Sequence, residues 1–320
     1  MRFVLQTKAD LFPKIPGECH ASTLVALPDG GFAAAWFQGT KEGWNDVAIY
    51  GTSMEPDGRW LQPVQWAKVN ALPHWNPVLF LPSQQKLLLF FKVGGPDELW
   101  HTWVQESNDS GRNWSPAREL VLGAPDARGP VKNKPIRLSD GAIMAGNSLE
   151  NDERWCVLTD RSTDDGATWI SSAIIEQTRT PGDLGVIQPT LWESPPGHVH
   201  MLTRSTSGFI YRSDSEDFGR TWSPLRPTVL PNNNSGIDLA QADDGRLLLA
   251  YNNPPDGRRR TPLTLAASND NGETWQNLHE LENADGEFSY PAVIHLGGNR
   301  FAGTYTNRRK TITFWQGVLQ

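Results

Sequence analysis

Cysteine is scarce in this chain, with only Cys19 and Cys156 among its 320 residues. Two cysteines are too few for a disulfide framework or a zinc site, so we expect free thiols. No apolar run approaches the roughly 20 residues that a membrane-spanning helix needs. The first residues, from Met1 to Lys8, become polar too early for the apolar core of a signal peptide. These absences together predict a cytoplasmic location.

Positive charge is also in the minority, because the formal net charge is −7. An acidic chain lacks the basic field that general binders of nucleic acid or anionic membranes need. The histidines show no metal-ligand spacing, and there is no phosphate loop, Gly-x-Ser-x-Gly elbow or dinucleotide fingerprint. We therefore expect no metal and no organic cofactor. The oligomeric state is not indicated by the sequence.

Tryptophan and the turn-forming residues are plentiful, with 14 Trp, 29 Gly and 24 Pro. They are spread evenly along the chain, and no long stretch places apolar residues at helical spacing. Aromatic residues between regularly placed turns are typical of many short strands. The composition therefore predicts an all-β protein.

One octapeptide, Ser-x-Asp-x-Gly-x-x-Trp, occurs four times. The copies are Ser107–Trp114, Ser162–Trp169, Ser215–Trp222 and Ser268–Trp275, and a degenerate fifth copy is Ser53–Trp60. Successive copies begin 53 to 55 residues apart. A fixed period of this length indicates a repeat architecture. Ser and Asp can bond the amides of a tight turn, and Gly accepts a positive φ. We therefore interpret these boxes as structural hairpin corners whose Trp packs between neighbouring sheets.

A second repeat precedes each box and consists of an apolar strand, a turn and another apolar strand. Its six copies begin at His20, Asn76, Lys134, Gln188, Ser235 and Tyr290. Units too small to bury both of their own faces can close radially. The pattern predicts a six-bladed β-propeller formed by residues 1–320 as a single domain. The last unit lacks a box, so the N-terminal segment 2–5 and segment 311–315 are expected to complete the ring.

The starts of the first strands and the ends of the second strands should meet at one mouth of such a ring, opposite the boxes. Cationic candidates there are Lys132, Lys134, Arg204, Arg260 and Arg308, joined by Asn133, Asn252 and Trp36. Converging cations would repel each other unless an anion binds between them, and guanidinium groups suit a carboxylate. These residues are therefore predicted to bind an acidic oligosaccharide or glycan. Tyr290, His20, Asp46 and Glu150 are the candidates for nucleophilic or proton-transfer roles.

The boxes and the mouth residues resemble the sialidase (neuraminidase) superfamily, in particular its bacterial branch of predicted neuraminidases with Asp-box repeats. The resemblance covers nearly the whole chain. It implies that Arg204 and Arg260 hold a substrate carboxylate. It also implies that Tyr290 is the nucleophile and that Asp46 is the acid/base, a Tyr nucleophile being an exception among glycosidases.

Two positions depart from the pattern of that superfamily. The first-blade motif Arg-Ile-Pro is replaced by His20-Ala21-Ser22, so its arginine is absent. The glutamate that activates the tyrosine is replaced by Gln188, which cannot accept a proton. Glu150, on the neighbouring blade, is the alternative base.

The leading expectation is a sialidase-like, exo-acting glycoside hydrolase that removes or cleaves next to an acidic sugar. In it Asp46 or His20 protonates the leaving oxygen. Two alternatives stay open. One is a polysaccharide lyase that acts on a uronate, with His20 or Tyr290 as base and acid. The other is a non-catalytic glycan-binding propeller.

Overall fold

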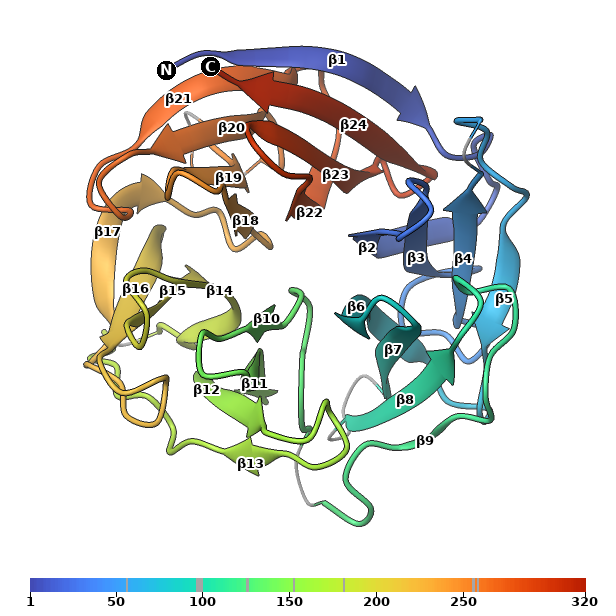
Figure 1. Ribbon diagram of the computed structural model, residues 1–320, viewed down its shortest axis with the longest axis horizontal. Coiled ribbons are helices and arrows are strands. Elements are labelled where there is room, and N and C mark those ends of the chain that lie inside the picture. Colours follow the sequence, from blue (N-terminus) through green and yellow to red (C-terminus); the bar gives the residue numbers. More distant parts are fainter. Residues whose placement is uncertain are drawn as a thin grey trace.

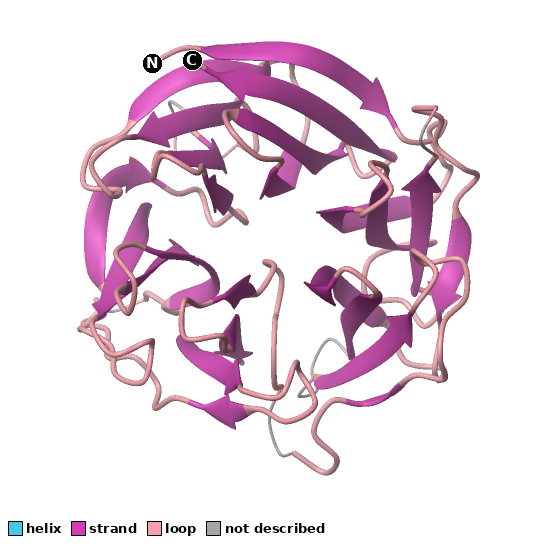
Figure 2. Ribbon diagram, in the orientation of Figure 1, coloured by secondary structure: helices cyan, strands magenta, loops and turns pink. Residues whose placement is uncertain are grey.

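Six four-stranded antiparallel sheets surround a central axis in the computed structural model of the protein (Figure 1). The structure describes the chain except residues 56, 96–99, 125–126, 152, 181, 255–256 and 258, and the elements of the described residues are strands and loops (Figure 2). The all-β, six-bladed propeller predicted from the repeats is therefore confirmed.

Five blades follow the chain from their innermost to their outermost strand. The first blade contains β2 (Glu18–Ala26), β3 (Phe32–Gly39), β4 (Ala48–Met54) and β5 (Val64–Ala67), and the second contains β6 (His74–Ser83), β7 (Lys86–Val93), β8 (His101–Ser107) and β9 (Arg118–Glu119). The third contains β10 (Ile136–Arg137), β11 (Ile143–Glu150), β12 (Trp155–Ser162) and β13 (Ile170–Ser171), and the fourth contains β14 (Val186–Glu193), β15 (Val199–Ser205), β16 (Phe209–Ser215) and β17 (Arg226–Pro231). The fifth contains β18 (Asp238–Gln241), β19 (Leu247–Asn252), β20 (Leu263–Ser268) and β21 (Gln276–Glu282).

The sixth blade joins the two ends of the chain. Its inner strands are β22 (Phe288–His295), β23 (Arg300–Asn307) and β24 (Thr311–Leu319), and its outer strand is β1 (Phe3–Asp10). Strands β1 and β24 pair antiparallel from Phe3 opposite Leu319 to Asp10 opposite Thr313. The expectation that segments 2–5 and 311–315 complete the ring is therefore confirmed.

Buried apolar residues form six clusters, and each cluster lies between two adjacent blades. The alternation of side chains along a strand explains this distribution. In β3, Ala33 and Phe37 face the second blade, whereas Ala34 and Trp36 face the sixth. A blade therefore buries both of its faces only when it has a neighbour on each side.

The Asp boxes connect the third and fourth strands of their blades, as predicted. In the box of the third blade, Ser162 Oγ accepts from Gly166 N at 2.9 Å, and Asp164 Oδ1 accepts from Thr168 N at 2.8 Å. Trp169 belongs to the cluster between the second and third blades, as expected for a residue that fixes neighbouring sheets. The degenerate copy differs, because Ser53 Oγ donates across to Ser110 O of the next box at 3.2 Å; its Pro56 lies outside the described residues.

Candidate functional site

The inner strands of four blades begin with the same irregularity. The strand register shifts near their first residues, and a non-glycine residue there has a positive φ: Ala21 (56°), Asn76 (41°), Gln188 (57°) and Tyr290 (52°). Such a bulge re-aims a side chain, and left-handed backbone outside glycine costs about 1–3 kcal/mol. Strained positions of this kind cluster at functional sites. In this chain two of them, Gln188 and Tyr290, lie against each other.

A hydrogen-bonded triangle joins the fourth and sixth blades at this point. Arg204 Nη1 donates to the hydroxyl oxygen of Tyr290 and to Gln188 Oε1, the latter at 3.2 Å. Gln188 Nε2 lies 3.5 Å from the Tyr290 oxygen. Asn234 fixes the guanidinium further, since its Oδ1 accepts from Arg204 Nε at 2.7 Å. The three members of the triangle are buried.

Three cations from three different blades surround the Tyr290 ring. The Arg260 and Arg204 guanidinium carbons lie 5.5 and 5.6 Å from the ring centroid, and Lys132 Nζ lies 5.7 Å from it. Like charges held this close together favour an anion between or above them. The predicted convergence of Lys132, Arg204 and Arg260 is thus present in the structure.

Lys132 lies beneath this cluster rather than facing outward. Its Nζ donates to Pro291 O at 2.5 Å, to Asn133 Oδ1 at 2.9 Å and to Ile237 O at 3.0 Å. Burial lowers the pKa of Lys132 to about 7. Because protein oxygens occupy its donors, Lys132 supplies positive charge to the site rather than a hydrogen bond to a ligand.

His20 packs directly on Tyr290, with ring centroids 4.1 Å apart. Its Nδ1 lies 2.9 Å from the Thr306 hydroxyl oxygen. Burial, followed by the charges of nearby arginines with Arg309 foremost, holds the pKa of His20 well below its usual range. His20 is therefore a neutral imidazole at physiological pH.

An ion-pair chain borders the cations and was not predicted from the sequence. Glu287 accepts from Arg260 Nη1 at 2.7 Å and from Arg309 Nε at 3.0 Å, and Arg309 also pairs with Glu42. Burial alone would raise the pKa of Glu287, but the charges and hydrogen bonds of Arg260 and Arg309 lower it. This chain runs from the fifth blade through the sixth to the β3–β4 loop of the first. The only sequence signal for it is the position of Glu287, three residues before Tyr290.

The two predicted acid/base carboxylates lie outside the triangle. Asp46 is exposed on the β3–β4 loop, and hydrogen bonds from Thr40 lower its pKa. Glu150 ends β11, where its Oε1 accepts from Ser148 Oγ at 3.0 Å and burial raises its pKa. Neither carboxylate has a hydrogen bond to Tyr290 among the described contacts. The tyrosine hydroxyl therefore faces donors, not a base.

Three predicted ligand-binding residues occupy structural positions. Trp36 is fully buried and stacks on Phe12, with ring centroids 4.6 Å apart, because alternation along β3 turns it toward the sixth blade. Asn252 Nδ2 donates to Phe288 O at 2.8 Å, and Asn133 Nδ2 donates to Gln188 O at 3.0 Å. We therefore remove Trp36 from the substrate-binding candidates. Asn133 and Asn252 support the backbone of the site.

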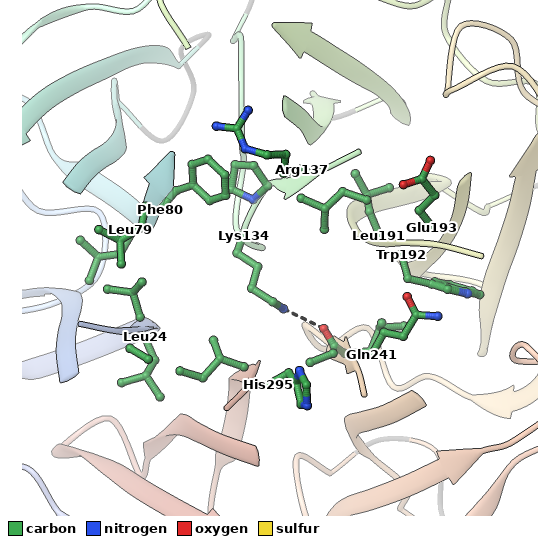
Figure 3. A pocket seen from close by; sticks show the side chains of 18 residues that line it. Leu24, Leu79, Phe80, Lys134, Arg137, Leu191, Trp192, Glu193, Gln241 and His295 are labelled. Carbon is green, nitrogen blue, oxygen red and sulfur yellow. Dashed lines mark hydrogen bonds between the residues drawn. The ribbon is translucent and has the colours of Figure 1, made fainter. Parts of the chain in front are cut away.

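Two predicted cations are directed elsewhere. Arg308 is exposed, lies over the Phe288 ring and donates to Asp285 O at 2.9 Å. Lys134 pairs with Asp238 at 3.0 Å and extends into a cavity of about 480 Å³ lined by the later residues of the inner strands (Figure 3). The expectation that both belong to the carboxylate-binding set is corrected, and Arg309 is the arginine of the β23–β24 turn that reaches the site.

Metal and membrane features are absent from the part of the chain that the structure describes. It contains no group of three or more His, Cys, Asp or Glu side chains arranged to hold a metal ion. No helix among those same residues is long and apolar enough to cross a membrane.

The chain matches the family described as BNR repeat-like domain over residues 30–302. No curated protein sequence matches it. Among solved structures, a protein of unknown function from Dyadobacter fermentans is 15% identical, with a TM-score of 0.81 and coverage of 99% of each chain. The Hadza microbial sialidase Hz136 is 17% identical, with a TM-score of 0.81 and coverage of 98% of this chain and 69% of that one.

A Trypanosoma rangeli sialidase in complex with the inhibitor DANA is 14% identical to this chain, with a TM-score of 0.74. The alignment covers 97% of this chain but 59% of the trypanosomal one. Likeness at these identities shows the fold alone. The family match spans most of the chain, and the chain therefore belongs to the BNR repeat-like domain family and has the six-bladed propeller fold.

Proposed function

We propose that this protein is a sialidase-like glycoside hydrolase that binds the carboxylate of an acidic sugar at the cations around Tyr290. The observation that carries the proposal is the convergence of Arg204, Arg260 and Lys132 within 6 Å of one tyrosine ring. Arginine binds carboxylates in a bidentate manner, and the buried lysine strengthens the field without competing for the ligand.

In the proposed reaction the Tyr290 oxygen attacks the anomeric carbon as the glycosidic C–O bond breaks. The hydroxyl proton passes to solvent water, and the leaving oxygen gains a proton from Asp46, because the neutral His20 imidazole is too weak an acid for this step. Water then cleaves the bond between Tyr290 and the sugar. The donors of Arg204 and Gln188 stabilise negative charge on the tyrosine oxygen, which is electrostatic assistance rather than general-base catalysis.

A uronate lyase is a second candidate for two reasons. The neutral imidazole of His20 lies against Tyr290, with ring centroids 4.1 Å apart. Gln188 occupies the position at which a sialidase would have its carboxylate base. In that reaction His20 or Tyr290 removes the proton α to the sugar carboxylate. The C–O bond at the β position then breaks, and the leaving oxygen takes a proton. The cations would stabilise the enolate-like intermediate.

Product analysis on a panel of acidic oligosaccharides separates these candidates. The panel includes glycans that end in N-acetylneuraminic acid and glycans that contain a uronate. Hydrolysis adds the mass of one water, whereas elimination adds none and creates a conjugated double bond that absorbs in the ultraviolet. Binding without a product from any member, equal in wild type and Tyr290→Phe, would overturn both enzymatic candidates in favour of a glycan-binding propeller.

A further inference from the structure

Trp44 differs from every other tryptophan of this protein. All 14 lie among the described residues, and Trp44 alone is exposed, with 54% of its surface accessible. The other tryptophans mostly pack between blades or against Asp boxes. A large aromatic residue that leaves about half of its surface in water contributes less to folding than a buried one. Its position instead offers a flat apolar face to a ligand.

The loop that carries Trp44 is held in place by bonds on several sides. Asp46 Oδ2 accepts from Thr40 N at 2.8 Å, which closes the loop. Lys68 Nζ donates to Asn45 O at 2.7 Å. The backbone of Gly43 packs close to the Trp75 ring, since a Cβ added at Gly43 would lie 3.4 Å from that ring. A side chain presented by such a fixed loop loses little conformational freedom when it binds a partner.

A shallow hollow that is widely open to solvent lies at this loop and is lined by Thr40, Gly43, Trp44, Asn45 and Asp46. An aromatic face beside carboxylate, amide and hydroxyl groups matches the two surfaces of a pyranose. The ring face can pack on the C–H side of the sugar, and the polar groups can bond its hydroxyls. The chemistry of this hollow is therefore suited to a neutral sugar ring.

Ion pairs connect this loop to the Tyr290 cluster. Glu42, two residues before Trp44, pairs with Arg309, and Arg309 shares Glu287 with Arg260. The Arg260 guanidinium lies 5.5 Å from the Tyr290 ring centroid. The loop and the cationic cluster thus belong to the same mouth of the propeller.

We propose that Trp44 is the platform of a second sugar subsite, which binds the neutral sugar next to the acidic one. The inference rests on the proposed function, because it places the acidic sugar at Arg204 and Arg260. It assigns Trp44 a role in specificity rather than in bond cleavage. The acidic sugar alone would not reach the platform, whereas a longer glycan would cover it.

Calorimetric binding of N-acetylneuraminic acid and of 3′-sialyllactose to the full chain tests this subsite. Trp44→Ala should weaken binding of the trisaccharide by roughly 3- to 10-fold, the range of one aromatic contact, and leave the monosaccharide unchanged. Trp44→Tyr should restore most of the loss. Ile170→Ala, a matched exposed apolar residue beside an Asp box, should change neither affinity. Equal losses for both sugars, or no loss for the trisaccharide, would overturn the proposal.

Oxidative labelling of Trp44, read by mass spectrometry, gives a test that does not depend on the acidic sugar. The trisaccharide should protect Trp44 at low concentration, and lactose should protect it at high concentration. Failure of every sugar to protect Trp44 would exclude the subsite. A separate result would count against the proposed function instead: trisaccharide affinity that falls in Trp44→Ala but is unchanged in Arg204→Lys.

Discussion

Arg204 donates a hydrogen bond to the hydroxyl oxygen of Tyr290, although 86 residues separate them in the sequence. The first residue lies near the end of β15 in the fourth blade, and the second lies in β22 of the sixth. Their contact therefore requires the ring to be closed. It also sets the charge around the oxygen on which the proposed chemistry depends.

Replacing Tyr290 with Phe should lower the rate of the chemical step by at least about 100-fold while ligand binding changes little. The substitution keeps the ring, its packing on His20 and the three cations around it, but it removes the oxygen. Single-turnover kinetics on a substrate found in the panel would measure the rate. Turnover close to wild type would remove Tyr290 from the mechanism.

Replacing Arg204 with Lys should weaken binding of an acidic sugar by about 1–3 kcal/mol, the contribution of a charge-assisted hydrogen bond. The charge is kept, but the planar guanidinium, whose Nη1 donates to Tyr290 and Gln188 and which can bind a carboxylate through two donors, is lost. Titration calorimetry gives the affinity. Arg308→Lys is the control, because Arg308 lies outside the site and should bind ligand as the wild type does.

Acidic-sugar affinity should fall as the pH rises through about 7, because burial places the pKa of Lys132 there and its charge is lost above it. The pKa of His20 lies well below its usual range, so His20 does not titrate in this window. Lys132→Met should bind weakly at every pH between about 6 and 9 and show no such step. A pH-independent affinity in the wild type would contradict the assigned role of Lys132.

The Asp boxes should be dispensable for chemistry. Asp164→Ala removes the acceptor for Thr168 N and Ser162 Oγ, both at 2.8 Å, and should lower the free energy of unfolding by about 1–3 kcal/mol. Activity per folded molecule should be unchanged. Chemical denaturation and a specific-activity assay would show both effects, and Thr163→Ala, an exposed position of the same box, serves as the control. An inactive but folded Asp164→Ala protein would argue against a scaffold role.

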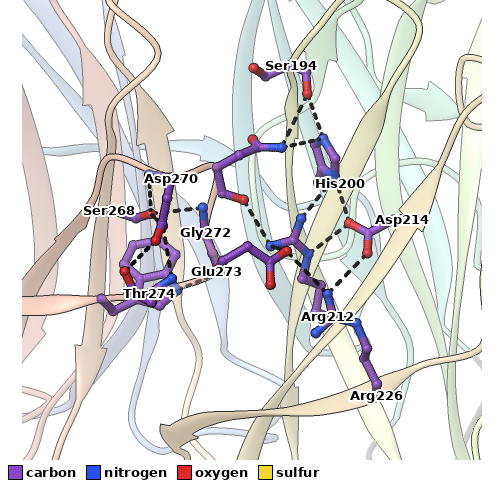
Figure 4. A network of polar contacts seen from close by, with 12 residues as sticks. Ser194, His200, Arg212, Asp214, Arg226, Ser268, Asp270, Gly272, Glu273 and Thr274 are labelled. Carbon is purple, nitrogen blue, oxygen red and sulfur yellow. Dashed lines mark hydrogen bonds and ion pairs between the residues drawn. The ribbon is translucent and has the colours of Figure 1, made fainter.

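A polar network beside the fourth and fifth blades should contribute to stability at neutral pH but not in acid (Figure 4). Asp214 Oδ1 lies 2.6 Å from His200 Nδ1 and 2.8 Å from Arg212 Nε. Burial alone would raise the pKa of Asp214, but the hydrogen bonds from His200 and Arg212 and the charge of Arg212 lower it to about 2.

Because the folded-state pKa of Asp214 lies below its unfolded value of about 4, its contribution is complete above that value and is lost as the pH falls through about 2. Asp214→Asn should therefore cost about 1–3 kcal/mol at neutral pH and progressively less between about pH 4 and pH 2. Urea unfolding of both proteins at each pH measures the difference. A difference that stays constant down to the lowest pH would contradict the role assigned to the charge.

The sequence predicts the features of this fold that depend on local chemistry. The boxes are turns whose Ser, Asp and Gly satisfy one another, and their spacing, together with the strand repeat that precedes them, indicates the blades. The site is harder to predict because it depends on backbone direction over one residue. No residue type in the sequence indicates the bulges that bring Gln188 and Tyr290 together. Which face of β3 carries Trp36 depends on the residue at which the strand pairing begins, and that residue is not evident from the sequence.

The β23–β24 turn shows that a shift of one residue in the sequence can decide whether a side chain reaches the site. Arg308 and Arg309 both have a positive φ, at 53° and 56°, and neither is a residue type that usually adopts it. The two side chains consequently diverge. Arg308 lies over Phe288 and is exposed, whereas Arg309 reaches Glu287 and Glu42. Sequence position alone does not distinguish two adjacent arginines.

The pairing of β1 with β24 also has a consequence for biosynthesis. Among the strands of the propeller, β1 is synthesised first and its partner β24 is synthesised last. Phe3 and Trp315 pack edge-on with ring centroids 5.6 Å apart, and Phe3 therefore gains this contact only after β24 is made. Five blades can assemble in the order of synthesis, but β1 keeps an open strand edge and an unburied aromatic ring until β24 is made. Until β24 is made, β1 is therefore free to pair with a wrong strand.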